Sequence, residues 1–157
     1  MGRVGLVRTL KGVIVFLAVL AAVFYGVLFP EVIGEFGEGE FAWLVTPATV
    51  AVELSVIPIA AALVLFWQIC TEIGRDRSFC HKNARRLTGI GFCALADTAY
   101  CVVGTVTIFA ITGGHPGVAL LSMAAAVCGL AIALAAFLLS HLVLKAADLK
   151  AENDLTI

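Results

Sequence analysis

Long uninterrupted runs of apolar residues dominate the chain, and short polar segments separate them. The first run lies between Lys11 and Glu31 and carries no charge. A helix needs about 20 apolar residues, each adding about 1.5 Å, to cross the hydrocarbon core of a bilayer. This run therefore predicts a membrane-spanning helix over residues 12–30.

The later apolar runs predict three more spans. Residues 47–70 contain one charge, Glu53, and the stretch from Leu87 to Leu144 contains only Asp97. The sequence TGGHPG at residues 112–117 interrupts that stretch, because glycine and proline favour a turn over a continuous helix. We therefore predict spans over residues 47–70, 87–111 and 118–144. Runs of this length favour helices over the short alternating strands of a membrane barrel.

The composition supports a membrane protein and excludes several other classes. Of 157 residues, 62% are hydrophobic and 13% are charged, whereas soluble domains are about half apolar and a quarter charged. Disordered, collagen-like, coiled-coil and secreted disulfide-rich proteins do not fit these values. We predict one membrane domain over residues 1–157.

The basic residues all fall on one side of the predicted spans. The ten Lys and Arg residues lie before residue 12, in the loop 72–86 and in the tail 145–157. Because Lys and Arg stay on the cytoplasmic side of a membrane, this distribution places both termini in the cytoplasm. The predicted fold is an all-α integral membrane protein with four transmembrane helices in an antiparallel bundle.

The fourth span carries small residues at steps of three and four, which draw one stripe along a helix. Close packing through small residues drives helix association in lipid. The pattern fits packing within one chain and packing between two chains of a homodimer. The stripe consists of Ala119, Ser122, Ala126, Gly129, Ala133, Ala136 and Ser140.

Glu53 and Asp97 are the most informative single positions, because a charged carboxylate in the membrane costs about 2.5 to 3.5 kcal/mol. One hypothesis is a proton relay or cation site, although about 11 Å along the helix axis separates the two acids and a water or a kinked helix must intervene. The alternative is two neutral carboxyls, hydrogen-bonded to Thr49, Tyr100 or a free carbonyl. Pro58 predicts a kink nearby, because it frees the carbonyl of the residue four positions earlier.

The residue types that carry enzyme chemistry show no recognisable arrangement. The cysteines form no C-x-x-C pair, and Cys80, His81 and His141 have weak spacing for a metal site. We expect no catalytic residue, metal or cofactor, because no nucleophile with its base and no phosphate-binding loop is present. We also expect no direct nucleic-acid binding, because the polar loop lacks a helix-turn-helix or zinc pattern.

The cytoplasmic loop over residues 72–86 and the tail over residues 145–157 are candidate contact surfaces. Basic side chains near a membrane attract anionic lipid head groups, at about 1 kcal/mol each. A protein partner is the sharper alternative, since a continuous helix through LKAADLKAENDL would present leucines to it. The candidate lipid-contact or partner-contact residues are Arg75, Arg77, Lys82, Arg85, Arg86, Leu149, Glu152, Asp154 and Leu155.

The same loop and tail resemble a bacterial family, domain of unknown function 2975. The resemblance rests on Ser78, Phe79 and Asn83 before the pair Arg85 and Arg86, on four spans, and on the final sequence AADLKAENDLTI. It implies a multi-pass protein of the bacterial cytoplasmic membrane. Members are often encoded beside a small helix-turn-helix regulator of the Cro/C1 type, which implies a membrane partner that holds or releases such a regulator.

Three functional hypotheses follow from the sequence. The first is a membrane-bound regulator or sequestering partner of a small helix-turn-helix transcription factor. The second is a small proton-coupled or cation transporter that uses Glu53 and Asp97 and forms a dimer. The third is a structural accessory subunit.

Overall fold

The described part of the chain is entirely helical. The computed structural model describes residues 3–31, 42–75, 80–113 and 116–154. Four helical segments, Gly5–Glu31, Ala42–Gly74, His81–Thr112 and Pro116–Asn153, are long and apolar enough to cross a membrane. The prediction of an all-α protein with four such helices is therefore confirmed. The elements in chain order are α1 (Arg3–Val23), η1 (Phe24–Leu28), α3 (Ala42–Leu54), α4 (Val56–Gly74), α5 (His81–Thr112) and α6 (Pro116–Asp154).

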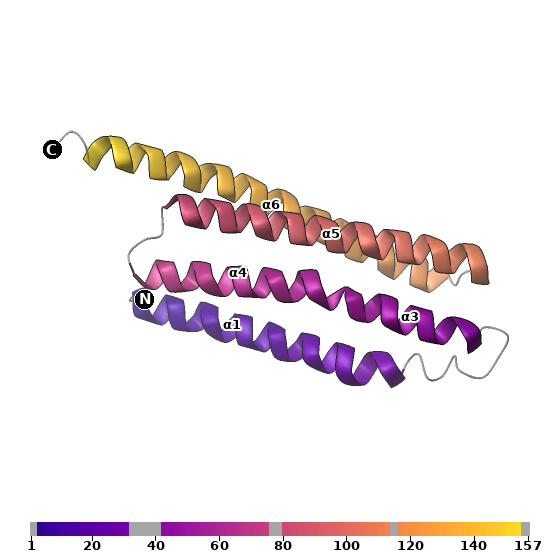
Figure 1. Cartoon of the computed structure of the whole chain (residues 1–157). Coiled ribbons are helices and arrows are strands. Elements are labelled where there is room, and N and C mark those ends of the chain that lie inside the picture. Colours follow the sequence, from indigo (N-terminus) through magenta and orange to yellow (C-terminus); the bar gives the residue numbers. More distant parts are fainter. Residues whose placement is uncertain (1–2, 32–41, 76–79, 114–115, 155–157) are drawn as a thin grey trace.

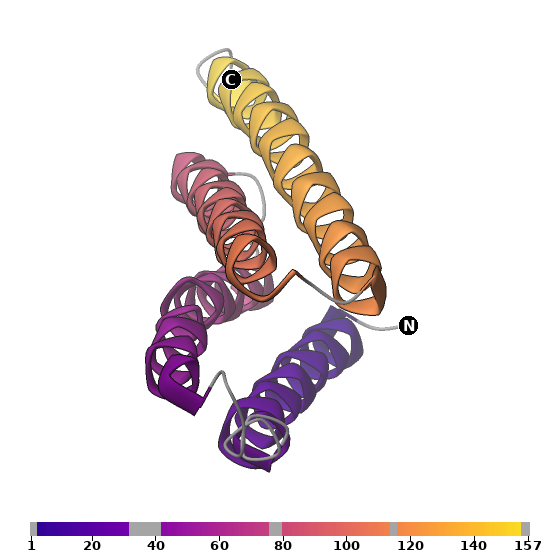
Figure 2. The same cartoon turned by 90° about the vertical axis from the view of Figure 1, so that its right-hand side faces the viewer.

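The helices lie side by side along one long direction, and each packs mainly on its neighbour in the sequence (Figure 1). α1 packs on α4, α4 packs on α5, and α5 makes the most extensive interface of the molecule with α6. The end-on view in Figure 2 shows an open curve, with α1 at one edge and α6 at the other. The first residues of α1 and α5 and the last residues of α4 and α6 share one end of the molecule, here called the charged end.

The second candidate span is interrupted at Ser55, where α3 ends and α4 begins. Pro58 has no N–H to donate to the carbonyl of Leu54, so the regular helical ladder cannot continue through this point. The backbone N–H of Ser55 bonds instead to the carbonyl of Val52 at 3.0 Å. The two helices nevertheless follow one another along one course (Figure 1). The predicted disturbance thus appears three residues before Pro58 itself.

The first candidate span also departs from a regular α-helix. After α1, residues Phe24–Leu28 form the π-helical turn η1, and the N–H of Phe29 donates to the carbonyl of Phe24. Single π-turns inside α-helices occur frequently at functional sites. η1 places Tyr25 beside the break at Ser55, as the hydrogen bond between their side chains shows.

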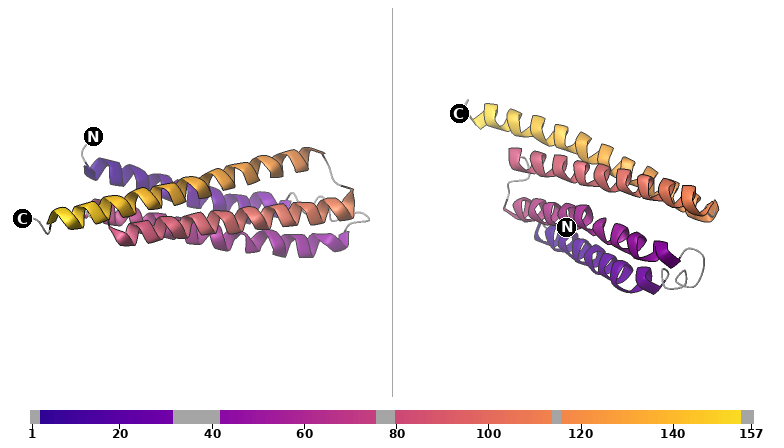
Figure 3. Two further views of the ribbon diagram at one scale, coloured as in Figure 1. Left: turned by 90° about the horizontal axis from the view of Figure 1, so that it is seen from above. Right: turned by 45° about the vertical axis from the view of Figure 1, so that its right-hand side comes forward.

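The turn between α5 and α6 begins with a left-handed glycine. Gly113 has φ 73°, and its N–H bonds to the carbonyl of Phe109. Glycine adopts this conformation without the steric cost that a Cβ imposes, so it ends α5. α6 then runs for 39 residues, or about 58 Å at 1.5 Å per residue, which is nearly twice the thickness of a bilayer core. Figures 1 and 3 show its C-terminal part projecting beyond the first turn of α5.

The small residues of α6 lie on the face that meets α5. Ala133 is completely buried, and Ser140 is bonded to Thr88 of α5. Thr98 of α5 occupies the position that a side chain at Gly129 would take. On α5, Gly91 makes room in the same way for the ring of Phe137. The part of the stripe from Gly129 to Ser140 therefore packs on α5 of the same chain.

The helices extend past the predicted spans. α1 begins at Arg3, α3 begins at Ala42 and α5 begins at His81, whereas the corresponding spans were placed at residues 12, 47 and 87. Thr46 and Pro47 consequently lie inside α3. A helix continues into water when its own hydrogen bonds and its neighbours support it, so these bounds do not fix where the membrane begins.

Candidate functional site

A polar cluster lies inside the membrane-spanning part of the molecule, where η1, the α3–α4 break and α5 meet. The hydroxyl of Tyr25 from η1 and the hydroxyl of Ser55 from the break are 2.8 Å apart. Ser55 is buried, and its hydroxyl also donates to the carbonyl of Val52 at 2.7 Å. From α5, Asp97 and Cys101 lie within electrostatic range of Tyr25. We call Tyr25, Ser55, Asp97 and Cys101 the intramembrane cluster.

Asp97 is the unsatisfied member of this cluster. Its Oδ1 atom is buried and has no hydrogen-bond partner among the described residues. A buried polar atom without a partner forfeits about 1 to 3 kcal/mol, and more when it is charged. Native proteins contain few such atoms, and each one requires an explanation. The Asp97 carboxyl is therefore the strongest candidate for a functional group in the described chain.

The two polar residues that the sequence suggested as partners of the acids have other partners. The hydroxyl of Tyr100 donates to the carbonyl of Ala51 in α3 at 2.6 Å. The hydroxyl of Thr49 donates to the carbonyl of Val45 in its own helix at 2.8 Å. The first of these bonds ties α5 to α3 next to the break, and neither bond involves a carboxyl group.

Glu53 and Asp97 have different surroundings. Glu53 is exposed on α3, whereas Asp97 is partly buried on α5. No hydrogen bond or ion pair joins the two acids in the described residues. The structure therefore gives Asp97 a place in a cluster and leaves Glu53 on the surface of the isolated chain.

The charged end contains a second set of polar contacts, which link α4 to α5 and α1 to α4. Arg86 of α5 lies 3.8 Å from Glu72 of α4, with both side chains largely buried, and it also donates to Asn83 at 3.1 Å. Asn83 itself is only 1% exposed. The ammonium of Lys11 from α1 lies 4.8 Å from the ring centre of Trp67 in α4. These contacts tie α1, α4 and α5 together in the half of the molecule nearer the charged end.

The contact that joins α5 to the projecting part of α6 is more exposed, and it is an ion pair when His81 is protonated. His81 Nε2 lies 3.0 Å from Asp148 Oδ1, with the two side chains 64% and 57% exposed. Past this pair, Leu149 is 67% exposed and Glu152 is also exposed. The end of α6 therefore exposes an apolar side chain, Leu149.

The remaining predicted contact residues are divided between described and masked parts of the chain. Arg75, which follows α4, is exposed, as are Lys82 and Arg85 on the first turns of α5. Asp154 is the last residue of α6. Arg77 and Leu155 lie outside the described residues.

Comparison with known proteins places this molecule in a family. A family model described as "Protein of unknown function (DUF2975)" matches residues 35–157. The chain belongs to this family. The resemblance seen in the loop and tail is thereby confirmed.

The DUF2975 protein is also similar to a curated bacterial protein. It is 26% identical over 106 residues to "Uncharacterized membrane protein YoaS" of Bacillus subtilis (strain 168), a match that covers 66% of each chain. The chain thus spans just under two thirds of this relative. Together with the four long apolar helices, the similarity supports a multi-pass membrane protein. No solved structure matches the chain at a significant level.

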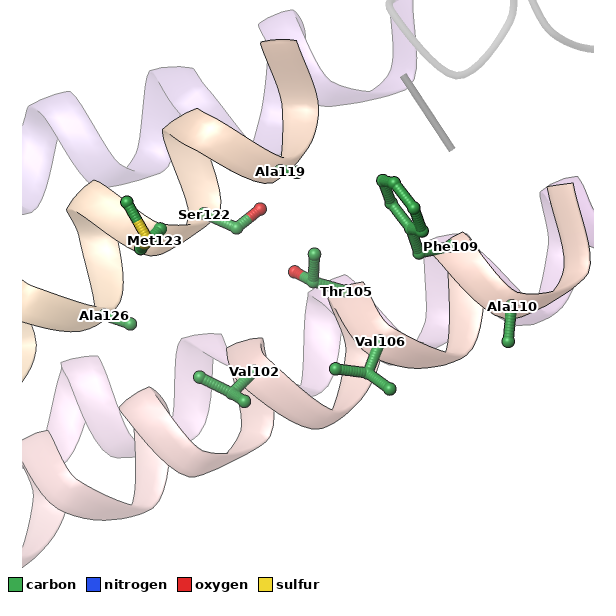
Figure 4. Close-up of a pocket in the computed structure, with 9 residues that line it drawn as sticks. All are labelled: Val102, Thr105, Val106, Phe109, Ala110, Ala119, Ser122, Met123 and Ala126. Carbon is green, nitrogen blue, oxygen red and sulfur yellow. The ribbon is translucent and has the colours of Figure 1, made fainter. Parts of the chain in front are cut away.

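An apolar cleft of about 520 Å³ separates α5 from α6 near the turn that joins them. Figure 3 shows the two helices diverging toward this turn, and Figure 4 shows the side chains that line the cleft. The hydroxyls of Thr105 and Ser122 donate to carbonyls in their own helices, so the cleft walls offer no free hydroxyl proton. The lining residues are Val102, Thr105, Val106, Phe109, Ala110, Ala119, Ser122, Met123 and Ala126.

The described residues contain no group of three or more metal-ligating side chains. Cys80 and His81 lie at the start of α5, and the five cysteines are free thiols. Sequence reasoning identified Asp97 but missed Tyr25 and Ser55. Their hydrogen bond joins residues 30 positions apart in the chain. The only signal in the sequence for a polar contact there is Ser55, three residues before Pro58.

Proposed function

We propose that this DUF2975 protein is a membrane-bound partner that holds or releases a small helix-turn-helix regulator in the bacterial cytoplasm. The observation that carries the proposal is the helical end of α6, which projects beyond α5 and exposes Leu149 (Figure 1). Helices that present apolar side chains are common docking elements for other proteins. The family resemblance supplies the class of partner.

The proposal requires the charged end to face the cytoplasm, with the four helices crossing the membrane in alternating directions. The positions of the basic residues support this orientation, because Lys and Arg residues cluster on the cytoplasmic side. A reporter fused after Ile157 tests it. Labelling of that reporter from the outer face of intact cells would contradict the orientation and the proposed docking surface together.

Recruitment of the regulator tests the docking surface. A helix-turn-helix regulator encoded beside the protein is co-expressed with it, and the membrane-bound fraction of the regulator is measured. We expect deletion of residues 146–157 to abolish membrane recruitment and Leu149→Ala to reduce it. The matched control is Leu142→Ala, a leucine on the same helix with 62% exposure that lies in the apolar span. Equal recruitment by the intact and shortened proteins would reject the proposal.

The transporter hypothesis has support only from Asp97, because Glu53 is exposed and no described contact joins the two acids. Reconstituted vesicles test it directly. Transport requires pH-driven flux by the unmodified protein that Asp97→Asn stops. An accessory structural role predicts neither flux nor recruitment of a regulator.

A further inference from the structure

The hydrogen bonds of the intramembrane cluster have a definite direction. A serine hydroxyl has one proton, and Ser55 must donate it to the carbonyl of Val52, which cannot donate. The bond between Tyr25 and Ser55 must therefore use the Tyr25 proton. The Tyr25 hydroxyl thus donates to the Ser55 hydroxyl, which donates to the carbonyl of Val52. Tyr25 has no second proton to donate to another acceptor.

Asp97 lies within electrostatic range of Tyr25, the first donor of this chain, and its buried Oδ1 atom has no hydrogen-bond partner among the described residues. The other hydroxyls on this part of α5 are committed, since Thr98 donates to the carbonyl of Ala94 and Tyr100 donates to the carbonyl of Ala51. An ionised carboxylate accepts hydrogen bonds only, whereas the protonated acid also donates one. A neutral Asp97 avoids the cost of an unpaired charge, and an ionised Asp97 needs a donor from a neighbour.

We propose that Asp97 is a proton-binding site whose ionisation switches the hydrogen-bond partner of Tyr25. With Asp97 protonated, Tyr25 donates to Ser55. When Asp97 releases its proton to water, the new carboxylate accepts the bond from Tyr25, which keeps its own proton. Ser55 then loses its contact with η1.

The switch acts at one end of the interface between α1 and α4. At the charged end, Lys11 over Trp67 still joins these helices, while release of Ser55 removes the polar tie near η1. The titratable groups that face Asp97 are Tyr25 from η1 and Cys101 from α5 itself. In the described residues α3, α4 and α6 place no charged side chain against it. Protonation of one carboxyl is therefore sufficient to set the state of this contact.

Infrared difference spectroscopy of the full chain in lipid nanodiscs tests the proton-binding step. Spectra are compared between about pH 4 and about pH 10, the ordinary ranges of a carboxyl and a tyrosine hydroxyl. We expect a protonated-carboxyl band that titrates in this interval and is lost in Asp97→Asn. The matched control is Glu53→Gln, which removes the other intramembrane acid and should retain the band. Identical carboxyl bands in the unmodified protein and Asp97→Asn would overturn the proposal.

Hydrogen exchange tests the change of partner. At each pH the backbone amide hydrogen exchange of residues 52–57 is compared between variants, so that the intrinsic effect of pH on exchange cancels. Once Asp97 ionises, we expect the amide exchange rate of the unmodified protein to be about threefold to tenfold higher than that of Asp97→Asn. The loss of one hydrogen bond predicts a difference of this size. Tyr25→Phe should show the faster exchange at every pH and lose the dependence on Asp97.

Tyr100→Phe is the matched control for this measurement, because it removes a tyrosine hydroxyl that bonds the same region of α3 and is not part of the switch. It should keep the dependence on pH. If Asp97→Asn does not fold, the comparison of Tyr25→Phe with Tyr100→Phe still shows whether Tyr25 changes its hydrogen-bond partner. A pH dependence in Tyr25→Phe equal to that of the unmodified protein would show that Tyr25 is not the switched group.

Discussion

The α5–α6 pair and the α1–α4 pair are both neighbouring helices in the same bundle, yet they are joined differently. Between α5 and α6, glycines sit where the partner's side chains need room, as at Gly91 and Gly129. Ala133 and Ser140 are buried in that interface. In α1, Ile14 is the one buried hydrophobic residue among those described, and a side chain added at Gly12 would meet open space.

α5 and α6 thus form a close-packed pair, whereas α1 is packed more loosely on α4. Lipid tails are as apolar as leucine, so apolar surface alone gives helices no reason to associate in a membrane. α5 and α6 associate through close backbone approach and shared hydroxyl groups. The span formed by α1 and η1 depends more on single polar contacts, namely Lys11 over Trp67 and Tyr25 with Ser55. Substitutions that act on these two kinds of contact should therefore differ in size.

The largest effect is expected from Gly129→Val. The new side chain would occupy the position of the Thr98 hydroxyl and force α5 away from α6. Overpacking of this kind costs about 1 to 3 kcal/mol. The measurement is the thermal unfolding midpoint of the detergent-solubilised protein. Gly104→Val is the control, because no atom of a neighbour lies within 4 Å of a Cβ at Gly104; equal losses in both variants would contradict close packing as the cause.

A smaller effect is expected from Ser140→Ala. Its hydroxyl lies 2.8 Å from that of Thr88 and donates to the carbonyl of Ala84 at 2.7 Å, so it joins the two helices. Hydrogen bonds between membrane helices contribute about 1 kcal/mol. Ser122→Ala is the matched control, because the Ser122 hydroxyl donates its hydrogen bond to the carbonyl of Val118 in its own helix. The same unfolding measurement should show a loss for Ser140→Ala alone.

α1 should respond to Lys11→Met, which keeps an apolar stem and removes the cation over Trp67. Cation–π contacts contribute about 0.5 to 1 kcal/mol at exposed sites. We expect faster hydrogen exchange in α1 and unchanged exchange in α5 and α6. Arg8→Met removes a nearby exposed cation on the same helix and serves as control. An equal increase of hydrogen exchange in α1 for both variants would show that the change of net charge, and not the contact with Trp67, causes the effect.

The smallest effect is expected from the exposed pair His81 and Asp148. Exposed ion pairs contribute about 0.2 to 1 kcal/mol, and salt screens them. With the His81 imidazole protonated, a double-mutant cycle with His81→Ala and Asp148→Ala should give a coupling in this range that disappears at high salt. A coupling that survives salt would show that the pair is held more rigidly than its exposure indicates.

The amino-acid sequence alone determined the number and type of the helices and the positions of the acids. Four apolar runs of membrane-spanning length permit few other structures, because every backbone polar group in lipid must be bonded within a helix or a closed barrel. The glycines at residues 112–117 indicated the turn at Gly113, and the period of small residues defined one face of α6. These are local properties, which a stretch of sequence carries by itself.

Only the tertiary structure decided which faces meet. Helical periodicity shows that residues share a face but does not name the helix opposite them, and in lipid the apolar side chains on all faces look alike. For this reason the pairing of the α6 stripe with α5 and the bond between Tyr25 and Ser55 were not predictable from spacing. The exposure of Glu53 and the partial burial of Asp97 likewise follow from how the helices pack, because both acids have the same local pattern of an isolated charge in an apolar run.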